Sequence, residues 1–347
     1  GLGNLLRRIP PLYNGVALWQ PVEMRNKRSI EIDLHTKEGQ ELIKKLVKEY
    51  DIVLENYRPG TLERWNLDYE NLKKANDKVI LVRVSGFGSN GPYSNRTSYD
   101  TIGAAMGGII YLNGYPDGPP LPLGIAYCDY ISAALNALAI LIADYYRRRK
   151  GHGQWAEITQ YGAIFRILEY TVAAYDKLGL LRKRTGNRLP SFAPCDIFKT
   201  KDGKWVTITA GDDKSFANLV RAMKTEGLKD DPRFQSISSR AENGKIINDI
   251  VARWVEDHKF EELKAVLDRE DVPFNHVNST KDIFEDPHCQ ARQNIIEAED
   301  PVIGRVKLPM VVPKFSKTPG IIKNTGAGLG ENKEEINIRE IRKNRKN

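Results

Sequence analysis

The chain has 347 residues, of which 41% are apolar and 28% charged, a composition typical of a folded protein large enough for two domains. Its three cysteines are widely spaced, and no CxxC or HxxxH pattern occurs, so neither a disulfide framework nor a metal site is indicated. The net charge is +8, but basic residues alternate with acidic ones along predicted helices, which favours a small anionic ligand over nucleic acid. The longest apolar stretch, residues 130–143, is too short to span a bilayer, and the first residues lack a signal-peptide pattern. We therefore expect a cytoplasmic protein that does not enter the membrane.

The first half of the chain alternates predicted strands with amphipathic helices. The predicted strands are 28–34, 51–56, 79–85 and 155–160, and the predicted helices are 37–50, 130–149 and 161–180. This alternation predicts an α/β fold with a Rossmann-like, doubly wound, mostly parallel sheet. Ligands of such sheets bind beyond the carboxyl ends of the strands.

The pattern changes after a basic, proline-containing segment at residues 184–194. Residues 195–210 predict a hairpin around a Lys-Asp-Gly turn, and residues 241–267 are helical. A strand near 271–279 and a second hairpin within 297–319 follow. This part of the chain predicts a smaller α+β domain.

One short motif has two interpretations. Residues 86–91 read G-x-G-x-x-G directly after a predicted strand, which is the pattern of a dinucleotide site. That site requires a helix to begin at the glycines, whereas Pro92 and the loop-like residues after it follow here. An NAD-dependent enzyme is therefore disfavoured, and a glycine-rich loop beside another ligand remains possible.

Asp129 precedes the apolar helix and also has two interpretations. Aspartate is a favoured N-cap residue, which is a purely structural role. A carboxylate at a helix N-terminus, flanked by apolar residues that limit water, can also attack a thioester and protect the resulting anhydride. The two roles are compatible.

The segment Glu55-Asn56-Tyr57-Arg58-Pro59-Gly60 directly follows a predicted strand. It can be a simple strand-to-helix turn, in which asparagine and Pro-Gly serve the backbone conformation. Polar side chains at the carboxyl end of a parallel strand also suit the phosphates and base of a nucleotide.

Several blocks in one order give the chain a family resemblance. The blocks NKRSIEIDLHTKEG, DIVLENYRPGTLERWNLDYENL, VRVSGFGSNGPYSNRTSYDTIGAAMGG, GYPDGPPLPLGIAYCDY and RRRKGHGQ resemble the class III CoA-transferases, the formyl-CoA and carnitine-CoA transferase type. Later blocks, including GNRLPSFAPCDIF and DPVIGRVKLP, resemble the same family. The resemblance implies a transferase that moves CoA from an acyl-CoA thioester to a carboxylic acid, with no prosthetic group.

The resemblance also implies residue roles. Asp129 occupies the position of the family's nucleophile, which forms an aspartyl anhydride and then an aspartyl-CoA thioester. The positions that would contact CoA or shape its site are Ile32, His35, Asn56, Tyr57, Arg64, Gly86, Gly88 and Tyr99. Relatives often carry lysine at the position of His35.

Three departures from the family pattern bear on function. The related alpha-methylacyl-CoA racemases carry histidine at the position of Tyr99, and tyrosine, with a reference pKa of about 10, is a poor base for their proton abstraction. Tyr99 thus favours a transferase over the alternative of a racemase or epimerase. The segment at 186–194 lacks the glycine run of formyl-CoA transferases, which disfavours oxalate and formate. The family's usual first strand–helix unit is apparently absent, which leaves a non-catalytic CoA-binding relative as another alternative.

The resemblance implies a domain layout and a quaternary structure as well. Residues 1–185 and 285–347 would form the large Rossmann-like CoA-binding domain, and residues 192–284 the small one. Two chains would form an interlocked homodimer with the site at their interface.

Overall fold

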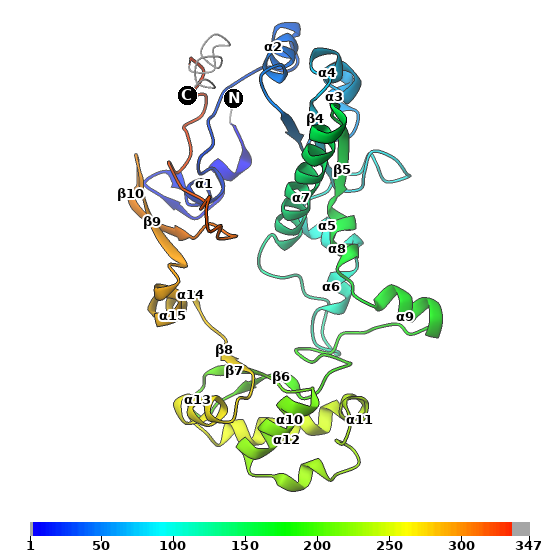
Figure 1. Ribbon diagram of the computed structural model, residues 1–347, viewed down its shortest axis with the longest axis vertical. Coiled ribbons are helices and arrows are strands. Elements are labelled where there is room, and N and C mark those ends of the chain that lie inside the picture. Colours follow the sequence, from blue (N-terminus) through cyan, green and yellow to red (C-terminus); the bar gives the residue numbers. More distant parts are fainter. Residues whose placement is uncertain (1–2, 335–347) are drawn as a thin grey trace. The chain divides into compact units, whose positions relative to one another are not determined.

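The computed structural model describes residues 3–334, which divide into two compact units. One unit comprises the described segments up to Arg83, from Ala139 to Ala156 and from Asn278 onward. The other comprises Val84–Leu138 and Glu157–Val277. Together they contain the mixture of helices and strands expected of an α/β fold (Figure 1).

A three-stranded sheet with the order β3-β4-β5 contains the predicted parallel pair. Strand β3 (Ile52–Glu55) runs parallel to β4 (Ile80–Ser85), and β5 (Trp155–Thr159) lies on the other side of β4. Helices α2 (Lys37–Val47), α3 (Thr61–Arg64) and α4 (Tyr69–Ala75) belong to the connections that lead to β3 and β4. Their apolar faces pack with the strands around a core of Val47, Leu62, Leu67, Leu72, Val79 and Leu81.

The rest of the first unit consists of short elements. They are η1 (Leu5–Arg7), β1 (Leu12–Tyr13), β2 (Val16–Ala17), α1 (Trp19–Glu23), α14 (Thr280–Glu285), α15 (Pro287–Ala291), and the antiparallel pair β9 (Ile295–Asp300) and β10 (Gly304–Pro309). The hairpin predicted within 297–319 is confirmed as β9–β10. The strand predicted at 28–34 is wrong, because these residues form no ladder with a neighbouring strand and their alternation alone cannot supply one.

In the second unit, three short helices pack around the start of the long apolar helix α7 (Tyr127–Lys150). These are α5 (Asp100–Met106), α6 (Ile109–Leu112) and α8 (Gln160–Arg166), and α9 (Thr171–Leu178) follows α8 along the chain. The single helix predicted at 161–180 is wrong. Glu169 adopts a left-handed conformation with φ of 53°, which ends one helix and reorients the chain into the next.

Residues 195–276 form an antiparallel sheet packed against helices. The strands β6 (Cys195–Lys199), β7 (Trp205–Thr209) and β8 (Phe274–His276) pair in that order, which confirms the predicted hairpin and the later strand. The accompanying elements are α10 (Asp213–Met223), η2 (Glu226–Lys229), α11 (Ile237–Glu242), α12 (Gly244–Glu256) and α13 (Phe260–Arg269). Strands and helices share one buried core that includes Ile208, Leu219 and Leu263. The domain boundaries at residues 192 and 284 stay a prediction.

Candidate active site

The Asp129 carboxylate lies in the first turn of α7, on the third residue of the helix. The interpretation of Asp129 as the N-cap is therefore wrong, because the helix already begins at Tyr127. The side chain of Asp100, from the start of α5, takes over the capping function: its Oδ2 accepts the backbone N–H of Asp129 at 2.9 Å. This bond involves only the backbone of Asp129, so the Asp129 carboxylate can bind other groups.

Gln160 is a partner of Asp129 that the sequence analysis missed. Its Nε2 donates to Oδ1 of Asp129 at 2.5 Å, across 31 residues of chain. Gln160 is the first residue of α8, directly after β5, and the N-cap hydroxyl of Thr159 accepts the N–H of Gly162 at 3.1 Å. A glutamine next to a polar strand end carries no distinctive local pattern, so only the packing of α7 against α8 reveals it.

The Asp129 carboxyl is harder to ionise than an ordinary aspartate. Partial burial raises its pKa, the hydrogen bond from Gln160 opposes that shift, and the nearby Asp100 carboxylate adds to it. The neighbouring thiol of Cys128 is fully buried, and desolvation raises its pKa to about 12. Because a nucleophilic thiol must first ionise, Cys128 is a poor candidate for the nucleophile and Asp129 is the better one.

The expected shielding of Asp129 from water is only partly present. Tyr127 and Cys128 are buried, but Asp129 itself and Tyr130 are exposed. The prediction that flanking apolar residues would limit water around this carboxylate is therefore wrong for the single chain. Successive side chains on a helix are rotated by about 100°, so the buried Tyr127 and Cys128 cover a different side of α7 from Asp129.

The glycine-rich loop lies next to this site but does not have dinucleotide-binding geometry. Residues 86–99 contain no helix, and the next helix begins only at Asp100. A Cβ atom on Gly86 would lie 2.0 Å from the Cβ of Ser98, and Gly88 adopts a positive φ of 92°. The loop therefore packs tightly along the segment that leads to α5, as residues that shape a wall would.

Tyr99 precedes α5 and points away from the protein. Its side chain is 69% exposed, and its backbone carbonyl accepts the N–H groups of Ile102 and Gly103. Nothing in the described part of its unit holds this phenol against the Asp129 carboxylate.

In the first unit, predicted CoA contacts gather around one indole ring. The rings of His35 and Tyr57 lie edge-on to Trp65, with centroids 5.2 and 5.1 Å away. The guanidinium of Arg64 donates to the hydroxyl of Thr61 at 2.9 Å. Asn56, which precedes Tyr57, is exposed. Aromatic faces and polar groups thus lie together beyond the carboxyl end of β3, where a nucleotide ligand is expected.

Glu55 holds this loop together with Glu63 and Arg83, two residues that the sequence analysis did not single out. Arg83, which pairs with Glu55 in the β3–β4 ladder, donates to Glu55 at 2.8 Å and to Glu63 at 2.7 Å. The second oxygen of Glu55 accepts the backbone N–H of Tyr57 at 2.7 Å. Burial raises the pKa of the Glu55 carboxyl more than these hydrogen bonds lower it. The loop after β3 is therefore anchored by a buried carboxylate that its arginine partner must compensate.

Ile32 is placed apart from the indole cluster. It is partly buried and lines a pocket that also contains the basic residues Arg7, Lys27 and Arg28. Glu31 lines the same pocket, and the three basic residues leave the pocket beside Ile32 positively charged.

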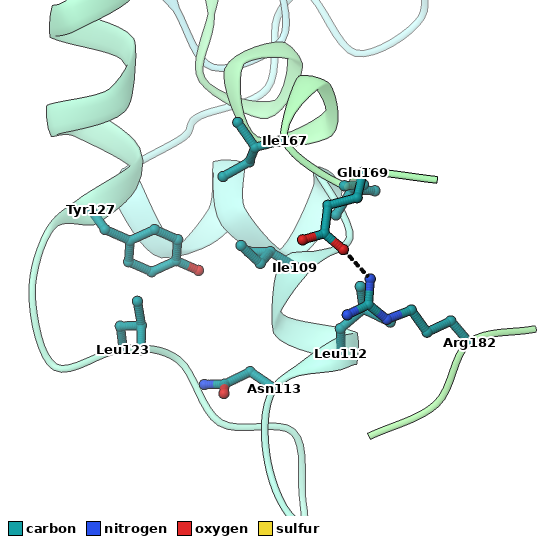
Figure 2. Close-up of a pocket in the computed structure, with 9 residues that line it drawn as sticks. Ile109, Leu112, Asn113, Leu123, Tyr127, Ile167, Glu169 and Arg182 are labelled. Atoms are coloured by element: carbon teal, nitrogen blue, oxygen red, sulfur yellow. Dashed lines mark hydrogen bonds and ion pairs between the residues drawn. The ribbon is translucent and has the colours of Figure 1, made fainter. Parts of the chain in front are cut away.

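The second unit also contains a largely apolar cavity of about 230 Å³ beside α7 (Figure 2). It is lined by Ile109, Leu112, Asn113, Leu123, Tyr127, Ile167, Leu168, Glu169 and Arg182. Glu169 and Arg182 form an ion pair at 2.8 Å. Tyr127 and Asp129 are two residues apart and point to different sides of the helix, so this cavity is distinct from the surface around Asp129.

The family described as CoA-transferase family III matches residues 2–333, and the chain belongs to this family. It is a CoA-transferase, an enzyme that acts on CoA thioesters.

Curated relatives agree with this assignment. The chain is 43% identical over 324 residues to succinyl-CoA–D-citramalate CoA-transferase from Chloroflexus aurantiacus, covering 93% of this chain and 81% of that protein. It is 32% identical over 363 residues to succinyl-CoA:mesaconate CoA-transferase from Haloarcula hispanica, covering 96% and 89%. A solved CaiB/BaiF family protein from Brucella suis superposes with a TM-score of 0.80 at 30% identity, covering 96% of this chain and 88% of that one.

Proposed function

We propose that Asp129 is the nucleophile in the transfer of CoA from an acyl-CoA thioester to a second carboxylic acid. The observation that carries the proposal is the carboxylate in the first turn of α7, with one oxygen bonded to Gln160 and the backbone amide bonded elsewhere. Such a carboxylate has an oxygen available to attack a carbonyl carbon. Membership of the transferase family supplies the reaction class.

The reaction proceeds in four balanced steps. An Asp129 oxygen attacks the thioester carbonyl of the donor, and the C–S bond breaks. CoA leaves as the thiolate, and the acyl group stays on Asp129 as a mixed anhydride. The thiolate then attacks Cγ of Asp129, which releases the donor acid and leaves an aspartyl-CoA thioester. The acceptor carboxylate attacks that thioester and regenerates an anhydride and the thiolate. Attack of the thiolate on the acceptor carbonyl gives the new acyl-CoA and frees Asp129.

Short dicarboxylic acids are the proposed substrates. The relatives from Chloroflexus and Haloarcula are named for succinyl-CoA together with citramalate, malate or mesaconate, and one from Agrobacterium fabrum for succinate and glutarate. All these acids carry two carboxylates on a backbone of four or five carbons. We expect succinyl-CoA as donor and an acid of this class as acceptor.

The proposed CoA-binding residues are Ile32, His35, Asn56, Tyr57, Arg64, Gly86, Gly88 and Tyr99. The indole cluster supports the assignment of His35, Tyr57 and Arg64, because exposed aromatic rings and a nearby guanidinium suit an adenine and its phosphates. The basic residues around Ile32 supply further positive charge for an anionic ligand.

A second copy of the chain is the proposed cover for Asp129. An acyl anhydride survives only where water is excluded, and Asp129 is exposed in one chain. Apolar side chains on the neighbouring helices are exposed as well, among them Ile102 and Met106 on α5. A homodimer that buries these residues would close the site, and we expect this assembly to work in the cytoplasm.

The test is CoA exchange between succinyl-CoA and a panel of dicarboxylic acids, with hydroxylamine added to trap the enzyme-bound acyl group. The native enzyme should give labelled Asp129 and new acyl-CoA products, and Asp129→Ala should lose exchange by at least about 10³-fold. Full exchange by Asp129→Ala would contradict the proposal. Deuterium uptake at the alpha carbon without exchange would indicate racemisation instead, and CoA binding without either reaction would indicate a non-catalytic protein.

A further inference from the structure

Three residues from separate segments form a hydrogen-bonded chain that ends on the proposed nucleophile. The hydroxyl of Ser98 contacts Oε1 of Gln160 at 2.9 Å, and Nε2 of Gln160 contacts Oδ1 of Asp129 at 2.5 Å. These residues come from the segment before α5, the start of α8 and the start of α7. All of them belong to the second unit.

The chemistry of the groups determines the direction of every bond in this chain. An ionised carboxylate can only accept, so the amide nitrogen of Gln160 must face Asp129. The amide oxygen then faces Ser98, whose hydroxyl must donate to it. Ser98 therefore keeps the Gln160 amide from turning its oxygen toward the carboxylate.

Close packing also holds the base of the Gln160 side chain in place. A Cβ atom on Gly103 of α5 would lie 2.6 Å from the Cβ of Gln160, so only glycine fits there. On the other side, the thiol of Cys128 donates to the backbone carbonyl of Gln160 at 3.4 Å. Gln160 is thus fixed at both ends before any substrate binds.

We infer that Gln160 is a catalytic residue that stabilises the negative charge developing on Oδ1 of Asp129 when a nucleophile attacks the aspartyl carbonyl. The inference rests on the proposed function of Asp129 as nucleophile. Because Oδ1 is held by Gln160, Oδ2 is the oxygen that forms the bond to the acyl group. When the CoA thiolate attacks Cγ, the C=O electrons move onto Oδ1, and the fixed Nε2–H donor lies within hydrogen-bond distance of it.

The same donor serves the acceptor half of the reaction. Attack of the acceptor carboxylate on the aspartyl-CoA thioester again places negative charge on Oδ1 before the C–S bond breaks. Gln160 therefore acts in both steps that occur at Cγ of Asp129. In the two steps at the acyl carbonyl, the charge develops on an oxygen of the substrate instead.

The test compares Gln160→Met with the native enzyme in succinyl-CoA exchange. Methionine has a similar length but no N–H donor, so we expect kcat to fall about 100-fold, as for loss of one oxyanion donor, with the KM for succinyl-CoA within about twofold. Intact-protein mass spectrometry after acid quench should show slower formation of the aspartyl-CoA adduct. Gln235→Leu, a change at an exposed glutamine that donates to the carbonyl of Asp230, is the matched control and should leave both measurements unchanged.

Two further variants keep the inference falsifiable if Gln160→Met folds poorly. Ser98→Ala leaves the donor present but lets the amide turn, so we expect a smaller fall in kcat, about 10-fold, without a change in KM. Gln160→Glu retains the shape but has no N–H donor when ionised, so we expect its kcat to fall at least as far as that of Gln160→Met at pH 7. Native-like kcat in Gln160→Met and Ser98→Ala would overturn the inference. If Asp129→Ala loses exchange in parallel, only the role of Gln160 fails, whereas retained exchange in Asp129→Ala means that the nucleophile itself is wrong.

Discussion

At the scale of single residues, Asp129 combines an ionised group with surroundings that disfavour its charge. Burial and the Asp100 carboxylate raise its pKa, and the Gln160 amide is the group that opposes them. A raised pKa means that the folded protein favours the protonated carboxyl over the carboxylate more than water does. The same environment should make its charge a cost to folding.

Asp129→Asn should therefore be slightly more stable than the native protein at pH 7. A carboxyl whose pKa is raised by folding contributes most to stability at low pH, and that contribution is lost as the pH rises through the folded pKa. Asparagine keeps the Oδ1 acceptor for Gln160 but carries no charge at any pH. We expect the unfolding midpoint to rise by about 1–2 °C, since Asp129 is exposed and the effect is screened.

Thermal unfolding measured at a series of pH values below 7 tests this expectation, and the difference should shrink as the pH falls and the native carboxyl takes up a proton. Asp100→Ala is the control and should lower the free energy of unfolding by about 1 kcal/mol, because the N–H of Asp129 loses its acceptor. An Asp129→Asn protein less stable than the native one at pH 7 would contradict the argument.

At the scale of secondary-structure elements, ion pairs link the carboxyl end of β3 to β4 and α3. Arg83 bridges the buried Glu55 and the more exposed Glu63, and Glu55 also holds the Tyr57 amide. The two glutamates share one arginine but differ in burial. They therefore form a natural matched pair for experiment.

Glu55→Ala should lower the free energy of unfolding by about 3 kcal/mol, because it leaves a largely buried guanidinium with one exposed partner and the Tyr57 N–H with none. Glu63→Ala should cost less than about 1 kcal/mol, as expected for an exposed ion pair. Urea unfolding of both variants measures the difference. Equal losses of stability, or a larger loss for Glu63→Ala, would show that burial does not determine how much each ion pair of Arg83 stabilises the fold.

At the scale of the whole molecule, the apolar helix α7 leaves several large apolar side chains exposed. By length and composition it could cross a membrane, yet a single such helix is weak grounds for a membrane protein, since the helices of soluble enzymes pass the same test. Leu141, Ile142 and Tyr145 are 67%, 58% and 61% exposed. The proposed homodimer would bury these exposed apolar side chains.

Leu141→Glu should convert a dimer into monomers and lower CoA exchange, because a charge on this face cannot be buried against a second copy. Sedimentation velocity at micromolar concentration, with exchange measured on the same sample, tests the expectation. Val312→Glu changes an equally exposed apolar residue outside α7 and should leave the dimer intact. A native protein that is monomeric and fully active would contradict the proposed homodimer, and association only with a different chain would indicate a complex of unlike subunits.

Local patterns in the sequence determined much of the secondary structure. The alternation of strands and helices, the hairpin at 195–210 and the hairpin β9–β10 follow from periodicity and turn residues that act within a few positions. The family blocks determined the reaction class and pointed to Asp129. These features are readable because each depends on neighbours along the chain.

The tertiary structure alone decided what surrounds Asp129. The bond from Gln160 spans 31 residues and the cap from Asp100 spans 29, and no local pattern distinguishes either residue. The exposure of Asp129 and the failure of residues 28–34 to form a strand have the same origin. Hydrogen-bond partners and burial are set by which distant segments pack together, and that packing follows from the free energy of the whole fold rather than from any one segment.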